Sequence, residues 1–411
     1  YVFEARPWEL KKTESIDVMD AVGSNIRVDT YGWEVKRVLP RINEDINEEW
    51  ISDKTRYSCD GLKYQRLDSP FIKEGNKFKK ISWNSAYDIL KTKIENTNSN
   101  KIGCFTGDLT NMETCYAAKE LFNKVLKSTM TESRCENYYV NFSEKQNYRF
   151  NSCISGIEIA DFILMIGCNP RYEATILNSR IRKTFLKSKL PIYSTNDIGD
   201  QTYPYNILEN TSNLIKDIVE NRHNLSEKII NSSKPIIIIG QSALKLKSGQ
   251  YIFEEIKKFL TKHNKINNEW NALNILSNNA STVGSYDLSI FSSNNGRNLL
   301  KEKLSENSID LLFLIGQDKL KLDAAGPKYD IIFANLNCGP RQAINTILLY
   351  SSLLKGNDGI YVLLLKLPSA IKPEVAKQYF MGILLEKGIR TVNDVFLFNN
   401  GPKEITFVMR P

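Results

Sequence analysis

The sequence predicts an α/β fold with parallel sheets, because short apolar segments of strand length alternate with amphipathic helical segments. The strand segments are apolar at successive positions, as expected of parallel strands that helices cover on both faces. The expected strands are Ile102–Phe105, Ile159–Gly167, Pro191–Ser194, Ile236–Ile239, Leu311–Ile315 and Ile331–Leu336. They predict two doubly wound parallel-sheet lobes, at residues 76–230 and 231–345.

Helical signals stand between the expected strands. Ser82 introduces a helical pattern that continues through Ile94. Thr110 and Glu113 have the spacing of a capping box, which predicts that a helix begins there. Its expected apolar face carries Met112, Cys115, Leu121, Phe122 and Val125. Further helices are expected over Ala174–Leu186 and Gln250–Leu260, and residues 290–298 are expected to form an exposed loop.

The two ends of the chain differ from this α/β body. Residues 1–75 are expected to form a small β-rich domain with a hairpin, because Asn25–Val28 and Trp33–Leu39 alternate apolar and polar residues around a turn at 29–32. The acidic segment Asn43–Asp53 is expected to be a loop or short helix. Residues 346–411 are expected to be a divergent cap with a helix over Ala376–Lys387 and a strand over Thr406–Met409.

Composition argues against several classes of function. No apolar run approaches the roughly 18–20 residues that span a bilayer, so membrane association is expected only through partners. The seven cysteines form no C-x2-C pair, and two histidines, His223 and His263, are too few for His-based metal sites or Ser-His catalysis. The net charge of +8 mixes basic with acidic residues. Its strongest basic cluster, at 180–189, is expected to be a solvated or subunit-facing helix surface, not a nucleic-acid site.

One spacing matches a metal-binding pattern. Asp17, Asp20, Ser24 and Ser52 occupy the four ligand positions of C-x2-C-x3-C-x27-C, a plausible frame for a four-iron cluster. We call them the frame residues. Cysteine thiolates hold iron–sulfur clusters, and two carboxylates with two hydroxyls are not an ordinary cluster site. Cys59 lies near the frame but out of register with it, and it is expected to be a small buried hydrophobic residue.

Polar turns follow two expected strands, at the edge where α/β sheets bind ligands. They are 167–170 and 240–242, and neither G-x-G-x-x-G nor G-x4-G-K-[ST] occurs in the chain. We expect these turns to be kept for their geometry, with nucleotide binding as the alternative. Asn169, Arg171 and Glu173 are expected to form a buried polar network or an interface.

Several segments resemble the 75 kDa subunit family, the largest iron–sulfur subunits of mitochondrial NADH:ubiquinone oxidoreductase (respiratory complex I). The segments are Phe3–Asp17, Val18–Asn25, Leu39–Arg41, Asn43–Arg56, Asp60–Leu62 and Gln65–Leu67, followed by Asn169–Arg171 and Arg180–Lys183. The resemblance is close over residues 1 to about 75, clear to about 245, and is not followed beyond about 345.

This resemblance implies a molybdopterin oxidoreductase-like fold that begins with a small domain of the 4Fe-4S type, here without cluster ligands. It also implies that this chain has no cofactor of its own. Iron–sulfur clusters and FMN are then expected in partner subunits or in an N-terminal part. In place of the family's late Asn-x-Glu-Gly-Arg segment the chain has Leu348–Leu354 and Gly359–Leu365, a second sign of a lost cofactor. The chain opens at Tyr1 without an initiator Met, which we expect to reflect a split gene or a fragment.

The expected function is that of a scaffold in the peripheral arm of proton-pumping NADH:ubiquinone oxidoreductase, on the matrix side of the mitochondrial inner membrane. No catalytic, cofactor-binding or metal-binding residue is expected. The expected partners are the N-terminal iron–sulfur domain of the same subunit, on the same or a separate polypeptide, and other peripheral-arm subunits. Arg6, Pro7 and Trp8 either contact that domain or pack internally. Two alternatives are an active molybdopterin oxidoreductase acting on a substrate such as formate, and a module that binds a nucleotide in the cleft.

Overall fold

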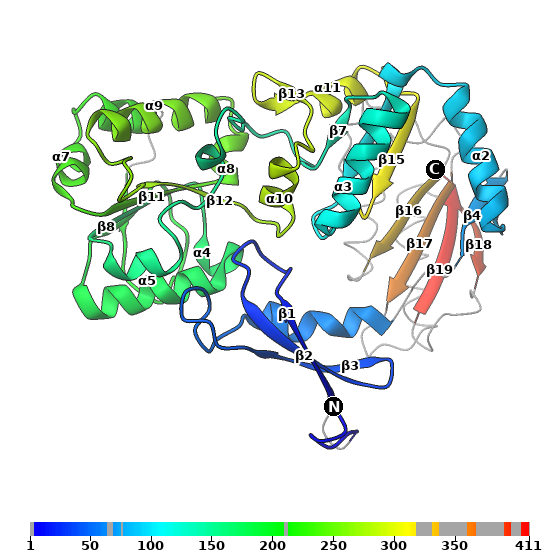
Figure 1. Cartoon of the computed structure of the whole chain (residues 1–411), viewed down its shortest axis with the longest axis horizontal. Helices are drawn as coiled ribbons and strands as arrows, with labels where there is room; N and C mark the ends of the chain where they lie inside the picture. The colour runs from blue at the N-terminus through cyan, green and yellow to red at the C-terminus, as the bar shows by residue number, and fades with distance from the viewer. Residues whose placement is uncertain are drawn as a thin grey trace. The chain divides into compact units, whose positions relative to one another are not determined.

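The computed structural model describes residues 4–63, 69–74, 77–208 and 213–317, and four strands further along the chain. The chain divides into two compact units. The first contains residues 1–64, 99–300 and 311–320, and the second contains residues 65–98, 301–310 and 321–411. Figure 1 shows the elements of both, coloured along the chain.

The small domain, which we define as residues 4–63, is a three-stranded antiparallel sheet followed by a short helix. Its elements are β1 (Lys11–Ile16), β2 (Asn25–Tyr31), β3 (Glu34–Pro40), α1 (Asp53–Tyr57) and the 3₁₀ turn η1 (Ser58–Lys63), with strand order β1-β2-β3. The predicted hairpin is confirmed. Its turn comes later than predicted, because Gly32, at φ 57°, supplies the left-handed conformation. Cys59 packs against the core of Ile26, Val38 and Ile51, as expected of a small apolar residue.

The larger parallel sheet has the strand order β10-β9-β8-β11-β12. Its strands are β8 (Phe162–Ile166), β9 (Ile192–Ser194), β10 (Asn206–Ile207), β11 (Pro235–Gly240) and β12 (Leu273–Leu276). All neighbouring pairs are parallel. Every residue of β8 and β11 is buried. The prediction of an α/β fold with buried parallel strands is therefore confirmed.

Helices cover both faces of this sheet (Figure 1). They are α4 (Pro170–Glu173), α5 (Thr175–Ser188), α6 (Leu214–Val219), α7 (Asn224–Asn231), α8 (Gln241–Lys245) and α9 (Gly249–Lys262). Residues of α5 pack with Ile163 and Met165 on one face. Residues of α6, α7 and α9 pack with Leu164 and Ile166 on the other, so successive residues of β8 face opposite layers.

The strand order reverses between β8 and β11, which is the topological switch point of this sheet. The chain runs from β8 outward to β9 and β10, then returns to place β11 on the other side of β8. The expected lobe boundary near residue 230 therefore falls between strands of one sheet. Parallel strands need long crossovers, so neighbours in a sheet are distant in sequence.

The smaller parallel sheet has the order β15-β6-β7. Its strands are β6 (Ile102–Thr106), β7 (Thr131–Glu132) and β15 (Leu311–Ile315), and α3 (Met112–Glu120) with the π-helical turn η3 (Leu121–Leu126) connects β6 to β7. The predicted capping box is wrong, because Asn111 caps α3 by accepting a hydrogen bond from the amide of Thr114. The Thr110 hydroxyl instead donates to the carbonyl of Ile315 at 3.1 Å.

The apolar face predicted for α3 is only partly correct. Cys115 and Phe122 are buried, whereas Leu121 and Val125 are exposed. For Val125 the π-helical turn explains the difference, since its i→i+5 bonds change the helical period that the prediction assumed. Leu121 lies six residues after Cys115, which is off that face even in an ordinary α-helix.

The remaining elements of the body are short. They are η2 (Ser99–Lys101), η4 (Lys145–Asn147), η5 (Ser155–Ile159), α10 (Thr282–Asp287), β13 (Ser293–Asn294), β14 (Arg297–Asn298) and α11 (Leu299–Ser305). The exposed loop predicted at 290–298 is instead the β13-β14 hairpin, whose Asn298 is buried.

The second unit contains a hairpin, a helix and a mixed sheet. Its elements are β4 (Phe71–Glu74), β5 (Lys77–Lys80), α2 (Trp83–Glu95), β16 (Ile331–Leu336), β17 (Ile360–Lys366), β18 (Arg390–Val395) and β19 (Glu404–Arg410). Ser82 caps α2 as predicted, and the predicted strand over 406–409 lies within β19. The helix predicted at 376–387 lies outside the described residues. Of the helices that the structure describes, none has the length and apolar character needed to cross a bilayer.

Candidate functional site

The frame residues are all buried in the small domain. Asp17, Asp20 and Ser24 belong to the loop between β1 and β2, and Ser52 precedes α1. The loop closes on itself, because the amide of Asp17 donates to the carbonyl of Ser24 at 2.8 Å. Within residues 17–24 only the three frame residues are buried, so the spacing seen in the sequence marks the inward-facing side of this loop.

Thr55, which the sequence frame does not include, joins the loop to α1. Its hydroxyl donates to Asp17 Oδ2 at 2.6 Å and lies 2.8 Å from Ser52 Oγ. Its amide donates to Ser52 Oγ at 3.1 Å, so Ser52 is the N-cap of α1. The only sequence signal for Thr55 was its spacing of three residues from a potential capping serine.

The electrostatics of this region are unusual for a protein interior. Burial raises the pKa of Asp20 to about 6, opposed by the hydrogen bond from the amide of Val22 and reinforced by the charge of Asp17. Neither carboxylate forms an ion pair with the residues that the structure describes, although the exposed Lys54 acts on Asp20 at longer range. Ser24 Oγ is buried without a hydrogen-bond partner.

The turns after β8 and β11 lie at the topological switch point of the larger sheet, where its strand order reverses. A Cβ atom on Gly240 would lie 2.2 Å from the carbonyl oxygen of Gly167. The hydroxyl of Ser242 also donates to that carbonyl. The two turns therefore pack backbone to backbone at the place where α/β proteins usually bind ligands, as expected of turns kept for their geometry.

The polar residues after β8 go to different places. Asn169 joins a buried amide network, in which it donates to the carbonyl of Ile198 at 3.0 Å and accepts from Gln201 Nε2 at 3.1 Å. Arg171 instead pairs with Asp200 at the surface, at 2.7 Å. Glu173 is half-buried, its Oε2 has no hydrogen-bond partner, and burial raises its pKa. The predicted network among these three residues is therefore wrong, because Asn169 bonds to Ile198 and Gln201, and the Arg171 side chain bonds to Asp200.

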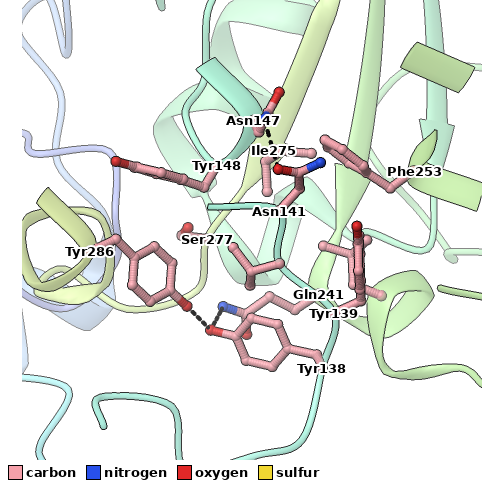
Figure 2. Close-up of a pocket in the computed structure, with 12 residues that line it drawn as sticks. Tyr138, Tyr139, Asn141, Asn147, Tyr148, Gln241, Phe253, Ile275, Ser277 and Tyr286 are labelled. Atoms are coloured by element: carbon pink, nitrogen blue, oxygen red, sulfur yellow. Dashed lines mark hydrogen bonds between the residues drawn. The ribbon is translucent and has the colours of Figure 1, made fainter. Parts of the chain in front are cut away.

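A cavity of about 10 Å³ lies beyond the ends of β11 and β12. Figure 2 shows Tyr138, Tyr286 and Gln241 pointing toward one another beside it. The two tyrosine hydroxyls are 2.7 Å apart, and Gln241 Nε2 donates to Tyr138 Oη at 3.3 Å. This volume holds about one water molecule. This cavity is therefore far too small for a nucleotide.

A fully buried ion pair follows β7. Arg134 contacts Glu132 through two parallel bonds, Nε to Oε1 at 3.0 Å and Nη2 to Oε2 at 2.7 Å. Arg134 also donates to the carbonyls of Tyr138, Ser292 and Gly296. This pair was not predicted from the sequence. Through Arg134 it connects the segment after β7 to the β13-β14 hairpin.

The basic cluster on α5 contains a contact between the small domain and the α/β body. Arg180 is only 2% exposed, and its Nε donates to the carbonyl of Ile46 at 2.9 Å. It also contacts Glu158 and the carbonyl of Glu44. The expectation of a solvated or subunit-facing surface is therefore wrong for Arg180, because the partner is the chain's own 44–48 loop.

Two family models match the chain. Residues 66–338 match the model described as molybdopterin oxidoreductase. The chain belongs to the molybdopterin oxidoreductase family. Residues 10–60 match a second model, described as the NADH-ubiquinone oxidoreductase NDSU1/NuoG-like 4Fe-4S domain.

Curated relatives include large subunits of mitochondrial complex I. The chain is 41% identical to the 78 kDa subunit of mitochondrial NADH-ubiquinone oxidoreductase from Candida albicans, over 78% of this chain and 44% of that protein. It is 42% identical to the 75 kDa subunit from Reclinomonas americana (79% and 48%) and 36% identical to the 78 kDa subunit from Neurospora crassa (88% and 48%). The chain spans about half the length of these relatives, and the predicted resemblance is confirmed.

Solved structures add no argument. The chain aligns with a fibrillarin from Methanococcus jannaschii with a TM-score of 0.20 and 12% identity, over 98% of this chain and 97% of that one. This similarity is too low to bear on the fold.

The prediction that this chain carries no cofactor is wrong by the second match, because the matched domain is described by its four-iron cluster. The frame residues, however, do not fit the thiolate donors that such clusters use. They present carboxylate and hydroxyl oxygens, and the Thr55 hydroxyl lies within hydrogen-bond distance of Asp17 and Ser52. We therefore assign no electron-transfer step to the frame residues.

Proposed function

We propose that this chain serves structurally in the peripheral arm of a proton-pumping NADH:ubiquinone oxidoreductase, on the matrix side of the mitochondrial inner membrane. In this role it supports the transfer of electrons from NADH to quinone by holding partner subunits in place. The names of its relatives give the complex. The structural role rests on one observation, which is that the turns after β8 and β11 pack against each other at the edge where α/β sheets usually bind ligands.

Two features of the structure support this role. The close approach of Gly240 to Gly167 leaves no space for a ligand between the turns after β8 and β11. The neighbouring cavity holds about one water molecule, and tyrosine side chains line it. The contact between the two turns stabilises the fold, which supports a structural role.

The N-terminal segment presents a surface suited to a protein partner. Trp8 is 75% exposed, and the Arg6 guanidinium lies 5.4 Å from the centre of its ring. Lys36 pairs with Glu4 at 2.8 Å and so holds this segment against β3. Exposed Trp and Arg side chains are typical anchors of protein interfaces. We assign this surface to contact with an iron–sulfur domain of the same subunit or with another peripheral-arm subunit, in preference to internal packing.

The test measures assembly and turnover separately in cells that depend on this chain. Gly240→Ala places a methyl group against the Gly167 carbonyl, so it should lower the amount of assembled complex on native gels. The NADH:ubiquinone rate per assembled complex should stay unchanged. Gly61→Ala is the matched control, because a Cβ atom there meets no neighbour. A normal amount of complex with a reduced rate per complex would contradict a structural role, as would stoichiometric molybdenum in the purified chain.

A further inference from the structure

The small domain buries five oxygen-bearing side chains of the β1-β2 loop and the start of α1, of which Asp17, Ser52 and Thr55 are in direct hydrogen-bond contact. This oxygen set consists of Asp17, Asp20, Ser24, Ser52 and Thr55. We propose that the oxygen set binds a hard divalent cation of the Mg²⁺, Ca²⁺ or Mn²⁺ class. The site lies outside the α/β body on which the proposed function rests.

The first argument is uncompensated negative charge. Asp17 and Asp20 are 3% and 4% exposed, and neither forms an ion pair with a described residue. Removing a carboxylate from water costs several kcal/mol, so buried carboxylates are normally paired with a cation or bind a metal. Elsewhere in the described chain, buried acids follow that rule. Asp29 contacts two arginines, and Glu132 contacts Arg134.

Second, one hydroxyl of the oxygen set has no hydrogen-bond partner among the described residues. Ser24 is 1% exposed, and its Oγ makes no hydrogen bond. Leaving a buried polar atom without a hydrogen bond destabilises the folded chain. Ser24 is one of the three buried residues of the 17–24 loop, and its carbonyl binds the amide of Asp17. A cation bound among these side chains would satisfy this oxygen and neutralise the carboxylates together.

The third argument is the chemistry of the donors. Carboxylate and hydroxyl oxygens suit hard cations, and Mg²⁺ commonly binds through only one or two carboxylates. The described residues contain no group of three His, Cys, Asp or Glu side chains that could hold a metal. Here two carboxylates supply the charge, and hydroxyls supply further ligands. The hydrogen bond from Thr55 to Asp17 does not prevent this, because a carboxylate offers about four lone-pair positions.

The experiment uses the full chain, treated with a chelator and then freed of it. MgCl₂, CaCl₂ and MnCl₂ are added separately, with binding measured by calorimetry and stability by thermal unfolding. At least one cation should bind and raise the melting temperature at millimolar concentration. Asp20→Asn and Ser24→Ala should each weaken binding about tenfold or more. Glu49→Gln removes an exposed acid of the same domain and should leave binding unchanged.

The two variants keep the test interpretable. Each removes a group that is unfavourable in the metal-free interior, so the metal-free variants should melt at or above the temperature of the unmodified chain. The proposal is overturned if none of the three cations raises the melting temperature, or if Asp20→Asn binds as the unmodified chain does. It is also overturned if the purified chain holds iron and acid-labile sulfide that Asp20→Asn loses and Glu49→Gln keeps.

Discussion

Asp20 and Asp29 are both buried carboxylates of the small domain, and their surroundings move their pKa values in opposite directions. Burial raises the pKa of Asp20 to about 6, and no cationic side chain in the described part of the chain forms an ion pair with it. Burial would also raise the pKa of Asp29, but hydrogen bonds from Arg27 and Arg37, at 2.8 and 2.7 Å, outweigh it and lower the pKa. The comparison indicates that ion-pair partners can keep a buried acid stable as an anion.

The largest expected effect comes from converting a paired acid into an unpaired one. Arg134→Met leaves Glu132 buried without its cation, which should cost about 3–5 kcal/mol of unfolding free energy. Urea unfolding at neutral pH measures this loss, and Glu132→Gln in the same chain should recover part of it. Arg222→Met, at an exposed ion pair, is the control and should change stability far less. A loss no larger than that of the control would contradict the conclusion that an ion-pair partner stabilises a buried acid.

The second prediction concerns the unpaired acid. In the metal-free chain, Asp20→Asn should raise the unfolding free energy at pH 7.5 by about 1–3 kcal/mol. The folded chain binds the Asp20 proton more tightly than the unfolded chain does. Its stability therefore falls as the pH rises from about 4 to about 6. The gain should vanish near pH 4, and urea unfolding at both pH values measures it. A gain independent of pH would show that charge is not its cause.

The third prediction concerns the paired acid of the same domain and has the opposite sign. Asp29→Asn should lower stability at pH 7 by about 1 kcal/mol, since Arg27 and Arg37 remain partly exposed to solvent. Because the folded pKa of Asp29 is lowered, this contribution is present above the ordinary Asp pKa and disappears as the pH falls below it. Thermal unfolding between pH 3 and 7 should show the difference shrinking in acid.

The smallest expected effect is at the surface. Trp8→Ala should change the unfolding free energy by less than about 0.5 kcal/mol, because the side chain is largely exposed. The same variant should reduce the assembled complex on native gels if Trp8 anchors a partner. A large loss of stability would instead mean that Trp8 packs within the small domain.

The sequence was informative where one local pattern decided the outcome. The isoleucine run of β11 predicted a buried strand, and Ser82 predicted the start of α2. A hydrogen-bond partner from a distant part of the sequence could not be predicted. Thr110 had the correct spacing for a cap, but its hydroxyl binds a carbonyl 205 residues away.

The candidate site likewise has features that the sequence could predict and features that it could not. The spacing, read together with the family resemblance of the surrounding segments, singled out the four frame residues as a group, and the structure buries all four. Spacing could not show that Thr55 would bridge Asp17 and Ser52, because that contact depends on how α1 packs against the β1-β2 loop. Nor could it show that Arg180 binds the carbonyl of Ile46, since the two are 134 residues apart.

The pairing of β6 with β15 also has a consequence during synthesis of the chain, because β6 must wait for β15 to be made. Thr106 at the end of β6 pairs with Ile315, which is 209 positions later (315 − 106), so β6 leaves the ribosome long before β15 is made. At about 5–20 residues per second, this interval lasts roughly 10–40 s. During that time the apolar strand Ile102–Thr106 has an unpaired edge, which is a template for aggregation. We therefore expect newly made chains to need a chaperone until residue 315 has emerged.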